Sequence, residues 1–305
     1  MLGSKLEILL TAALVGLATS AAAADEPDSI TWNPDWPRFR TSEAVVTGAM
    51  LLPIAGALFV YPHPDDNWHG GILFDDAIRD ALVRSSRDSR DQSARYSDFI
   101  YHFLGVYPLL IDNALVTWGI HGSGDVALEM LGMNLEAYAI TGAIVLTGES
   151  LGRVRPMENG CNVDPNYASK CGNDTAMNKS FMSGHTAIAF TSAGLMCAHH
   201  QHLPLYGGGA GDVAACWVAL AGSAAASVLR ITSDNHYATD VLLGAGIGLA
   251  SGYVLPTWLH YGFGKGAQTA SVLPTLRGGE GSSLRALLAP RLSSGFLGAQ
   301  LVGIY

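Results

Sequence analysis

The stretch LRITSDNHYATD, residues 229–240, separates two long apolar runs and decides the fold class. The runs on either side, residues 213–229 and 241–259, carry no charged residue over 17 and 19 positions. Apolar segments of this length, divided by clusters of Gly, Pro, Asn and Asp, are typical of helices joined by turns. Working outward, the same pattern predicts helices near residues 43–60, 74–93, 97–119, 125–151, 184–203, 211–231 and 237–260. We therefore expect an all-α fold, a helical bundle of about six to seven helices.

The composition narrows the class of protein further. The chain has 305 residues, of which 49% are hydrophobic and only 14% charged, and its formal net charge is -9. Low charge with high hydrophobicity excludes a disordered tail protein. Net acidity argues against a nucleic-acid binder, so we expect no nucleic-acid partner.

The apolar helices raise the question of a membrane. Residues 44–61, 213–229 and 241–259 are long enough, or nearly so, to cross a bilayer. Other helices are interrupted by Asp112 and Glu136, and a charge at mid-membrane costs several kcal/mol unless it is paired or faces a cavity. The sequence therefore favours a packed periplasmic domain, soluble or peripheral, over a polytopic membrane protein, which stays the alternative.

Both ends of the chain differ in amino-acid composition from the central segment. Lys5 precedes an apolar run and then the small residues TSAAAADE, which offer Ala-x-Ala cleavage sites. We expect residues 1–24 to be a signal peptide, with an uncleaved first helix as the alternative, and residues 25–262 to be the helical domain. Residues 263–305 are rich in Gly, Ser and Thr, and we interpret them as an appended C-terminal tail of unassigned role, with a β-hairpin as one conformation. The expected location is the periplasm or the periplasmic face of a bacterial membrane.

Four cysteines follow the signal segment. Cys161 and Cys171 lie in a polar loop, and an oxidising compartment would allow a disulfide between them. Cys197 and Cys216 lie in apolar helical stretches, where we expect buried thiols. The chain offers no convincing set of metal ligands, so we predict no metal site.

The first motif is GRVRP, residues 152–156, at the end of a predicted helix. Arg153 and Arg155 can present guanidinium groups to an anion, and Arg is suited to bidentate contact with phosphate. A basic helix C-terminus that offsets the helix dipole is the alternative interpretation.

The second motif is FMSGHTAIAF, residues 181–190. Ser183 is a good N-cap, Gly184 lets the backbone approach a ligand, and the free N–H groups of a first helical turn attract anions. His185 would stand beside a bound phosphate and could give a proton to a leaving group. The alternative is a Ser-capped helix with an incidental His.

The third motif lies within residues 229–240. His236 and Asp240 are four positions apart, so on a helix they share a face and the carboxylate can orient the imidazole. Arg230 adds a second positive clamp. Taken alone, a His/Asp pair at this spacing is common and carries little weight.

Together the three motifs, RxRP, SGH and R-x5-H-x3-D, resemble the signature of the type 2 phosphatidic acid phosphatase superfamily, which includes bacterial class A acid phosphatases and vanadium haloperoxidases. The resemblance covers roughly residues 40–260. It implies that Arg155, Arg230, Ser183 and the Gly184 amide hold the phosphoryl oxygens. It also implies that His236 attacks phosphorus to give a phosphohistidine, with Asp240 orienting it and His185 protonating the leaving group.

Three positions depart from the family pattern. The family's Lys before its Arg-Pro pair is Gly148 here, its Pro before Ser-Gly-His is Met182, and its Ser before the last Arg is Leu229. One phosphate contact is therefore missing, and Arg153 or Lys179 is expected to replace it.

The leading prediction is a metal-independent phosphatase that hydrolyses phosphate monoesters, with lipid phosphates or diphosphates as a second substrate class. We expect a phosphate-ester substrate and no cofactor, with membrane lipid as a further partner and no assignment of oligomeric state. The alternatives are a vanadium-dependent haloperoxidase, for which vanadate would be the cofactor, and a catalytically weak anion-binding envelope protein.

Overall fold

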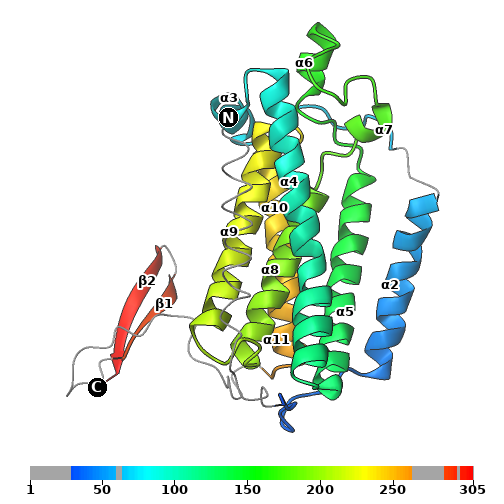
Figure 1. The fold of residues 1–305 in the computed structure, drawn as a ribbon. Helices are drawn as coiled ribbons and strands as arrows, with labels where there is room; N and C mark the ends of the chain where they lie inside the picture. Colours follow the sequence, from blue (N-terminus) through cyan, green and yellow to red (C-terminus); the bar gives the residue numbers. More distant parts are fainter. Residues whose placement is uncertain (1–28, 60–63, 263–284, 294–295, 305) are drawn as a thin grey trace, which may run out of the picture.

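A computed structural model describes residues 29–59, 64–262, 285–293 and 296–304 (Figure 1). The predicted all-α bundle with an appended tail is confirmed. Its long helices are α2 (Thr41–Phe59), α4 (Arg87–Tyr107), α5 (Gly124–Glu149), α8 (Gly184–His202), α9 (Ala210–Thr232) and α10 (Ala238–Leu249). Shorter elements are α3 (Asp75–Leu82), α6 (Glu158–Val163), α7 (Asp174–Met177) and α11 (Leu255–Leu259), with π-helical segments η2 (Pro108–Ile120) and η3 (Ala250–Val254).

Helix α8 is the central element of the bundle. It packs against α4, α5, α9, α10 and η3. Glycines allow the closest of these contacts: a Cβ at Gly252 would lie 2.1 Å from the Thr191 carbonyl oxygen, and one at Gly248 would lie 2.4 Å from the Ala187 carbonyl oxygen. The two helical backbones therefore touch, which fixes the start of α8 beside the start of α10.

The helix boundaries differ from prediction in one region. The expected helices at 74–93 and 97–119 are instead a short α3, a break, and a long α4 that runs on into η2. The break has a local cause, since the Ser86 side chain accepts a hydrogen bond from the Ser89 amide and caps α4. The loop after α5 also contains the two short helices α6 and α7, which were not predicted.

Within the described residues, four helical stretches are long and apolar enough to cross a membrane: Arg87–Ile120, Gly124–Glu149, Ala210–Thr232 and Ala238–Leu259. They indicate a membrane protein. The acidic residues that argued against this face inward: Tyr206 Oη donates to Asp112 at 2.8 Å, and Glu136 lies 2.9 Å from His260 Nε2. Because paired inward-facing charges are compatible with a span, the preference for a soluble or peripheral domain is corrected in favour of its alternative.

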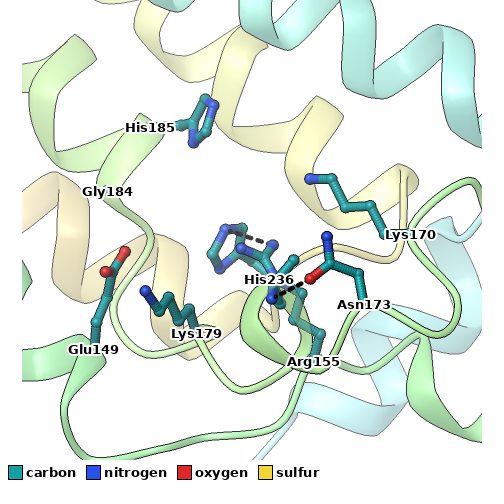
Figure 2. Close-up of a pocket in the computed structure, with 9 residues that line it drawn as sticks. Glu149, Arg155, Lys170, Asn173, Lys179, Gly184, His185 and His236 are labelled. Carbon is teal, nitrogen blue, oxygen red and sulfur yellow. Dashed lines mark hydrogen bonds between the residues drawn. The ribbon is translucent and has the colours of Figure 1, made fainter. Parts of the chain in front are cut away.

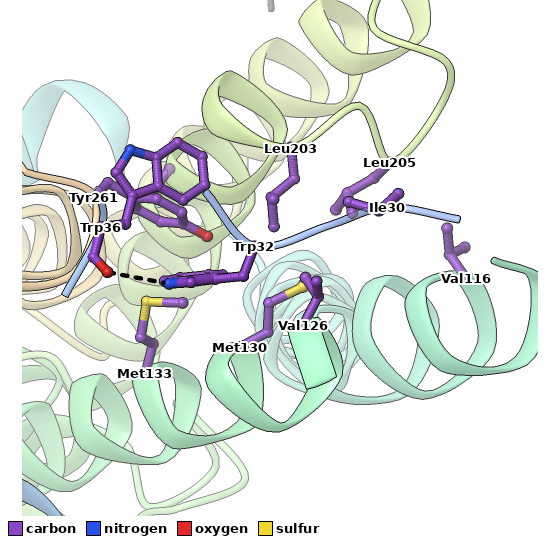
Figure 3. Packing of buried hydrophobic residues seen from close by; sticks show 11 residues of the cluster. Ile30, Trp32, Trp36, Val116, Val126, Met130, Met133, Leu203, Leu205 and Tyr261 are labelled. Atoms are coloured by element: carbon purple, nitrogen blue, oxygen red, sulfur yellow. Dashed lines mark hydrogen bonds between the residues drawn. The ribbon is translucent and has the colours of Figure 1, made fainter. Parts of the chain in front are cut away.

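The largest hydrophobic cluster closes the end of the bundle that lies away from α6 and α7 (Figures 1 and 3). Trp32 and Trp36, from the segment before α2, pack against Tyr261 with ring centroids 5.6 and 5.0 Å away. Met130 and Met133 of α5 complete the cluster and are fully buried. This packing leaves the opposite end of the bundle for the polar loops.

Two disulfides join the four cysteines. Cys161 of α6 is bonded to Cys171, as the sequence predicted. Cys197 of α8 is bonded to Cys216 of α9, so the prediction of buried thiols was wrong. Sequence could not reveal this pair, because it depends on how α8 and α9 face each other.

The C-terminal segment contains two strands, β1 (Arg285–Ser293) and β2 (Phe296–Ile304). They pair antiparallel, with Arg285 opposite Ile304 and Ser293 opposite Phe296, which is the β-hairpin considered for the tail. The predicted signal peptide, residues 1–24, lies outside the described residues.

Candidate active site

The three motifs meet at one end of the bundle, where the loop after α5, the loop before α8 and the α9–α10 turn surround a cavity of about 510 Å³ (Figure 2). Its lining comes from all three motifs and from the long loop between the first two. The lining residues are Glu149, Arg155, Lys170, Asn173, Ala176, Lys179, Gly184, His185 and His236.

His236 presents one ring nitrogen to this cavity. Its Nδ1 lies 2.7 Å from the Ser180 carbonyl oxygen. A carbonyl only accepts hydrogen bonds, so Nδ1 carries the proton and Nε2 keeps its lone pair. Burial, and after it the charges of Arg155 and Arg230, hold the pKa of His236 well below its usual value. The ring is therefore neutral and can act as a nucleophile.

Arg155 is fixed beside that nitrogen. Its Nε donates to the Ala176 carbonyl oxygen at 2.6 Å and its Nη1 to the Asn235 carbonyl oxygen at 2.9 Å. The same Nη1 lies 3.2 Å from His236 Nε2. The predicted clamp and the predicted nucleophile are thus adjacent, and an anion between them would meet both.

His185 stands in the first turn of α8, as predicted, and lines the cavity from the other side (Figure 2). Its Nε2 lies 3.0 Å from Asp98 Oδ1, and its ring is 4.5 Å from that of Tyr101. Burial lowers the pKa of His185 to about 4, against the opposing effect of the Asp98 hydrogen bond. The imidazole is therefore neutral at pH 7, because the Asp98 carboxylate alone does not keep it protonated.

Arg230 lies behind the cavity wall. It is buried, and it donates to the Ser97 hydroxyl at 2.6 Å, to the Ala94 carbonyl oxygen at 2.8 Å and to Asp98. Its Nη1 is buried with no hydrogen-bond partner among the described residues. Its charge lowers the pKa values of both motif histidines, but its side chain does not line the cavity, so its predicted contact with a phosphoryl oxygen stays a prediction.

Arg153 has a different role from the one predicted. Its side chain is fully buried and donates to Asp75 Oδ2 at 2.8 Å, to the Thr239 hydroxyl at 3.0 Å and to Asp240. It does not line the cavity. The assignment to phosphate binding is therefore corrected: Arg153 ties α3 and α10 to the loop that carries Arg155.

Asp240 supports His236 indirectly. Its carboxylate accepts hydrogen bonds from the Ser180 hydroxyl at 2.7 Å and the Tyr237 amide at 2.9 Å, as well as from Arg153. It lies 3.9 Å from His236 Nδ1, too far for a hydrogen bond. The predicted direct orientation is corrected to a relay, in which Asp240 fixes Ser180 and the Ser180 carbonyl holds the imidazole.

Ser183 and Gly184, which precede His185, have different roles. Ser183 is fully buried and its hydroxyl accepts from the Thr186 amide at 3.4 Å, so it caps α8 and does not line the cavity. Gly184 lines the cavity, and a Cβ there would lie 3.2 Å from Val145. The predicted backbone approach is thus available at Gly184, whereas the Ser183 hydroxyl is committed to the helix cap.

Sequence reasoning missed several residues of the site. Lys170 and Asn173 line the cavity from an irregular loop with no periodicity, and Asp98 reaches His185 and Arg230 from α4. No local pattern marks these residues. Lys179, named as a substitute cation, does line the cavity, beside Glu149 (Figure 2). Within the described part of the chain, no group of three or more His, Cys, Asp or Glu side chains could hold a metal ion.

Comparison with known proteins confirms the resemblance drawn from the motifs. Residues 131–263 match the model of the PAP2 superfamily. A lipid A 1-phosphatase of Porphyromonas gingivalis is 32% identical over 149 residues, which is 48% of this chain and 27% of the relative. The match therefore spans about a quarter of that relative's length. No solved structure matches the chain.

Proposed function

We propose that this chain, whose residues 131–263 form a PAP2 superfamily region, is a membrane phosphatase that hydrolyses phosphate monoesters of lipids. The observation that carries the proposal is the pairing at the cavity wall: the unprotonated Nε2 of His236 lies 3.2 Å from an Arg155 guanidinium nitrogen. A nucleophile and a cation so close together suit a phosphoryl group, whose oxygens need positive charge while its phosphorus accepts the attack.

The reaction takes two steps. First, His236 Nε2 attacks phosphorus and the P–O bond to the alcohol breaks, while His185 gives its proton to the leaving oxygen. Next, His185 accepts a proton from water, and the water oxygen attacks the phosphohistidine to release inorganic phosphate. Arg155 and the Gly184 amide are the donors for the phosphoryl oxygens, and Arg230 adds positive charge from behind the cavity wall. No step requires a metal ion.

The protonation states fit these roles once substrate is bound. His236 is neutral, as a nucleophile must be. Without a substrate anion beside it, His185 is neutral, with a pKa of about 4. A phosphate dianion beside it would favour the protonated form, because an adjacent opposite charge raises the pKa of a histidine. Substrate binding would thus charge the general acid.

Two observations support a lipid substrate over the soluble ester that the sequence favoured. The part of the chain that the structure describes has four helical stretches long and apolar enough to cross a membrane, and the cavity lies at one end of the bundle that they form. The relative from Porphyromonas gingivalis is itself named for removing a phosphate from a lipid. A headgroup at the membrane surface would be within reach of such a cavity.

The test is phosphate release by the purified protein in detergent micelles containing EDTA. The substrates are a short-chain phosphatidate, a nucleoside monophosphate and p-nitrophenyl phosphate. The matched variants are His236→Ala and His121→Ala, because His121 lies outside the cavity and contacts the Leu205 carbonyl oxygen. We expect turnover, highest on phosphatidate, that disappears only in His236→Ala. Equal turnover in both variants would contradict the nucleophile, and a preference for the nucleotide would contradict the lipid substrate.

A further inference from the structure

We infer that Lys170 is a further substrate-binding cation of this site, and that the Cys161–Cys171 disulfide positions it. This inference rests on the proposed phosphate-ester substrate, although phosphate binding tests it independently of turnover. Lys170 belongs to none of the three motifs. It comes from the loop between α6 and α7, which the sequence left without a role.

The geometry places Lys170 beside the reacting groups. Its Nζ donates to Asn235 Oδ1 at 2.9 Å, and the same oxygen accepts from Arg155 Nη1 at 3.2 Å. Two cations therefore converge on one neutral oxygen, next to His236 in the chain. Figure 2 shows the Lys170 ammonium pointing into the cavity, on the side facing away from Glu149 and Lys179.

The positive charges around Lys170 favour the binding of an anion. Burial is the main reason that its pKa falls to about 8, and the charges of Arg155 and Arg230 lower it further. Asp98 and Asp91 of α4 act in the opposite direction. An ammonium group held near two guanidinium groups costs free energy, and a bound phosphate dianion would offset that repulsion.

The disulfide explains how a loop residue keeps this position. Lys170 directly precedes Cys171, whose partner Cys161 lies in α6, shortly after Arg155. Both cysteines pack against a buried cluster formed by Val154, Met157, Ala168 and Met177. The bond therefore ties the backbone of Lys170 to the segment that carries Arg155. Without it, the position of Lys170 would depend on the hydrogen bond from its Nζ to Asn235, on the bond that its carbonyl accepts from the Asn173 amide, and on loop packing.

The test measures binding of inorganic phosphate by calorimetry and kcat and KM for phosphatidate, for the full chain in micelles. The variants are Lys170→Ala, Lys170→Arg, the pair Cys161→Ser and Cys171→Ser, and the triple combination. Two controls leave the cavity alone: the pair Cys197→Ser and Cys216→Ser, which removes the other disulfide, and Arg95→Ala, which removes an exposed cation of α4.

We expect Lys170→Ala to weaken phosphate binding by about 10- to 100-fold, the usual cost of losing a charged hydrogen bond. Lys170→Arg should stay within a few-fold of the wild type. Loss of the Cys161–Cys171 bond should weaken binding in the wild-type background but not when Lys170 is already Ala. Where the double Ser variant does not fold, reduction and thiol alkylation of the folded Cys197→Ser and Cys216→Ser variant, which keeps only the Cys161–Cys171 bond, replaces it.

The outcomes separate the two proposals. Unchanged phosphate affinity in folded Lys170→Ala would overturn the inference while leaving the phosphatase intact. A disulfide effect of equal size in both backgrounds would overturn the positioning role. If the wild type binds phosphate through Lys170 but turns over no substrate, the proposed function fails and the anion site stands.

Discussion

Arg153 and Arg155 stand two residues apart in one motif, yet Arg153 forms buried ion pairs and Arg155 lines the cavity. Replacing each of them by Ala distinguishes the structural role from the role in substrate binding. Arg153→Ala would leave Asp75 and Asp240 buried, each without the guanidinium group that pairs with it. Breaking a buried ion pair by removing one partner costs about 3–5 kcal/mol. Arg153 also lies between the rings of Trp68 and Tyr237, at 4.3 and 4.2 Å, so its loss opens a void as well.

The assay is thermal unfolding in micelles, with phosphate release measured on the protein that stays folded. About 3–5 kcal/mol corresponds to a fall in Tm of roughly 6–20 °C for a domain of this size. Arg155→Ala is the matched change. This substitution removes a side chain that donates hydrogen bonds to the neutral carbonyl oxygens of Ala176 and Asn235. It should therefore lower stability much less than Arg153→Ala, and it should abolish most of the turnover.

One result would refute this reasoning. If Arg153→Ala keeps the wild-type Tm and instead raises KM or the Kd for phosphate, Arg153 contacts substrate. The original assignment from the sequence would then be right, and the ion pairs with Asp75 and Asp240 would not form in the working protein.

Three further predictions follow from the same structure. Gly252→Ala should destabilise the bundle by about 1–3 kcal/mol, because its Cβ would lie 2.1 Å from the Thr191 carbonyl oxygen; Gly246→Ala, with open space around it, should not lower Tm. The pKa of Lys170 is lowered to about 8, so its side chain loses its positive charge above that pH. We therefore expect kcat/KM to fall as pH rises through about 8, and Lys170→Arg should not show that fall. Asp98→Asn should lower kcat more than it raises KM, because Asp98 holds the general acid at 3.0 Å; an unchanged kcat would remove Asp98 from the mechanism.

Much of the fold could be predicted because its signals are local. Long apolar segments predicted the helices, and the clusters of Gly, Pro, Asn and Asp between them predicted most of the helix boundaries. The prediction of a soluble or peripheral domain was wrong because it treated Asp112 and Glu136 as unpaired charges inside a membrane span. Their partners, Tyr206 and His260, lie 94 and 124 residues away, and only the packed bundle shows that these charges face inward.

By itself, the sequence identified three residues that meet at the site: Arg155, His185 and His236 line one cavity, as the order of their motifs indicated. Only the tertiary structure decided what each polar neighbour does. It assigned Arg153 to a buried ion pair and brought Lys170 into the cavity. The physical reason is range: helix formation and capping depend on residues within a few positions, whereas an ion pair or a cavity is made by side chains that the chain brings together from far apart.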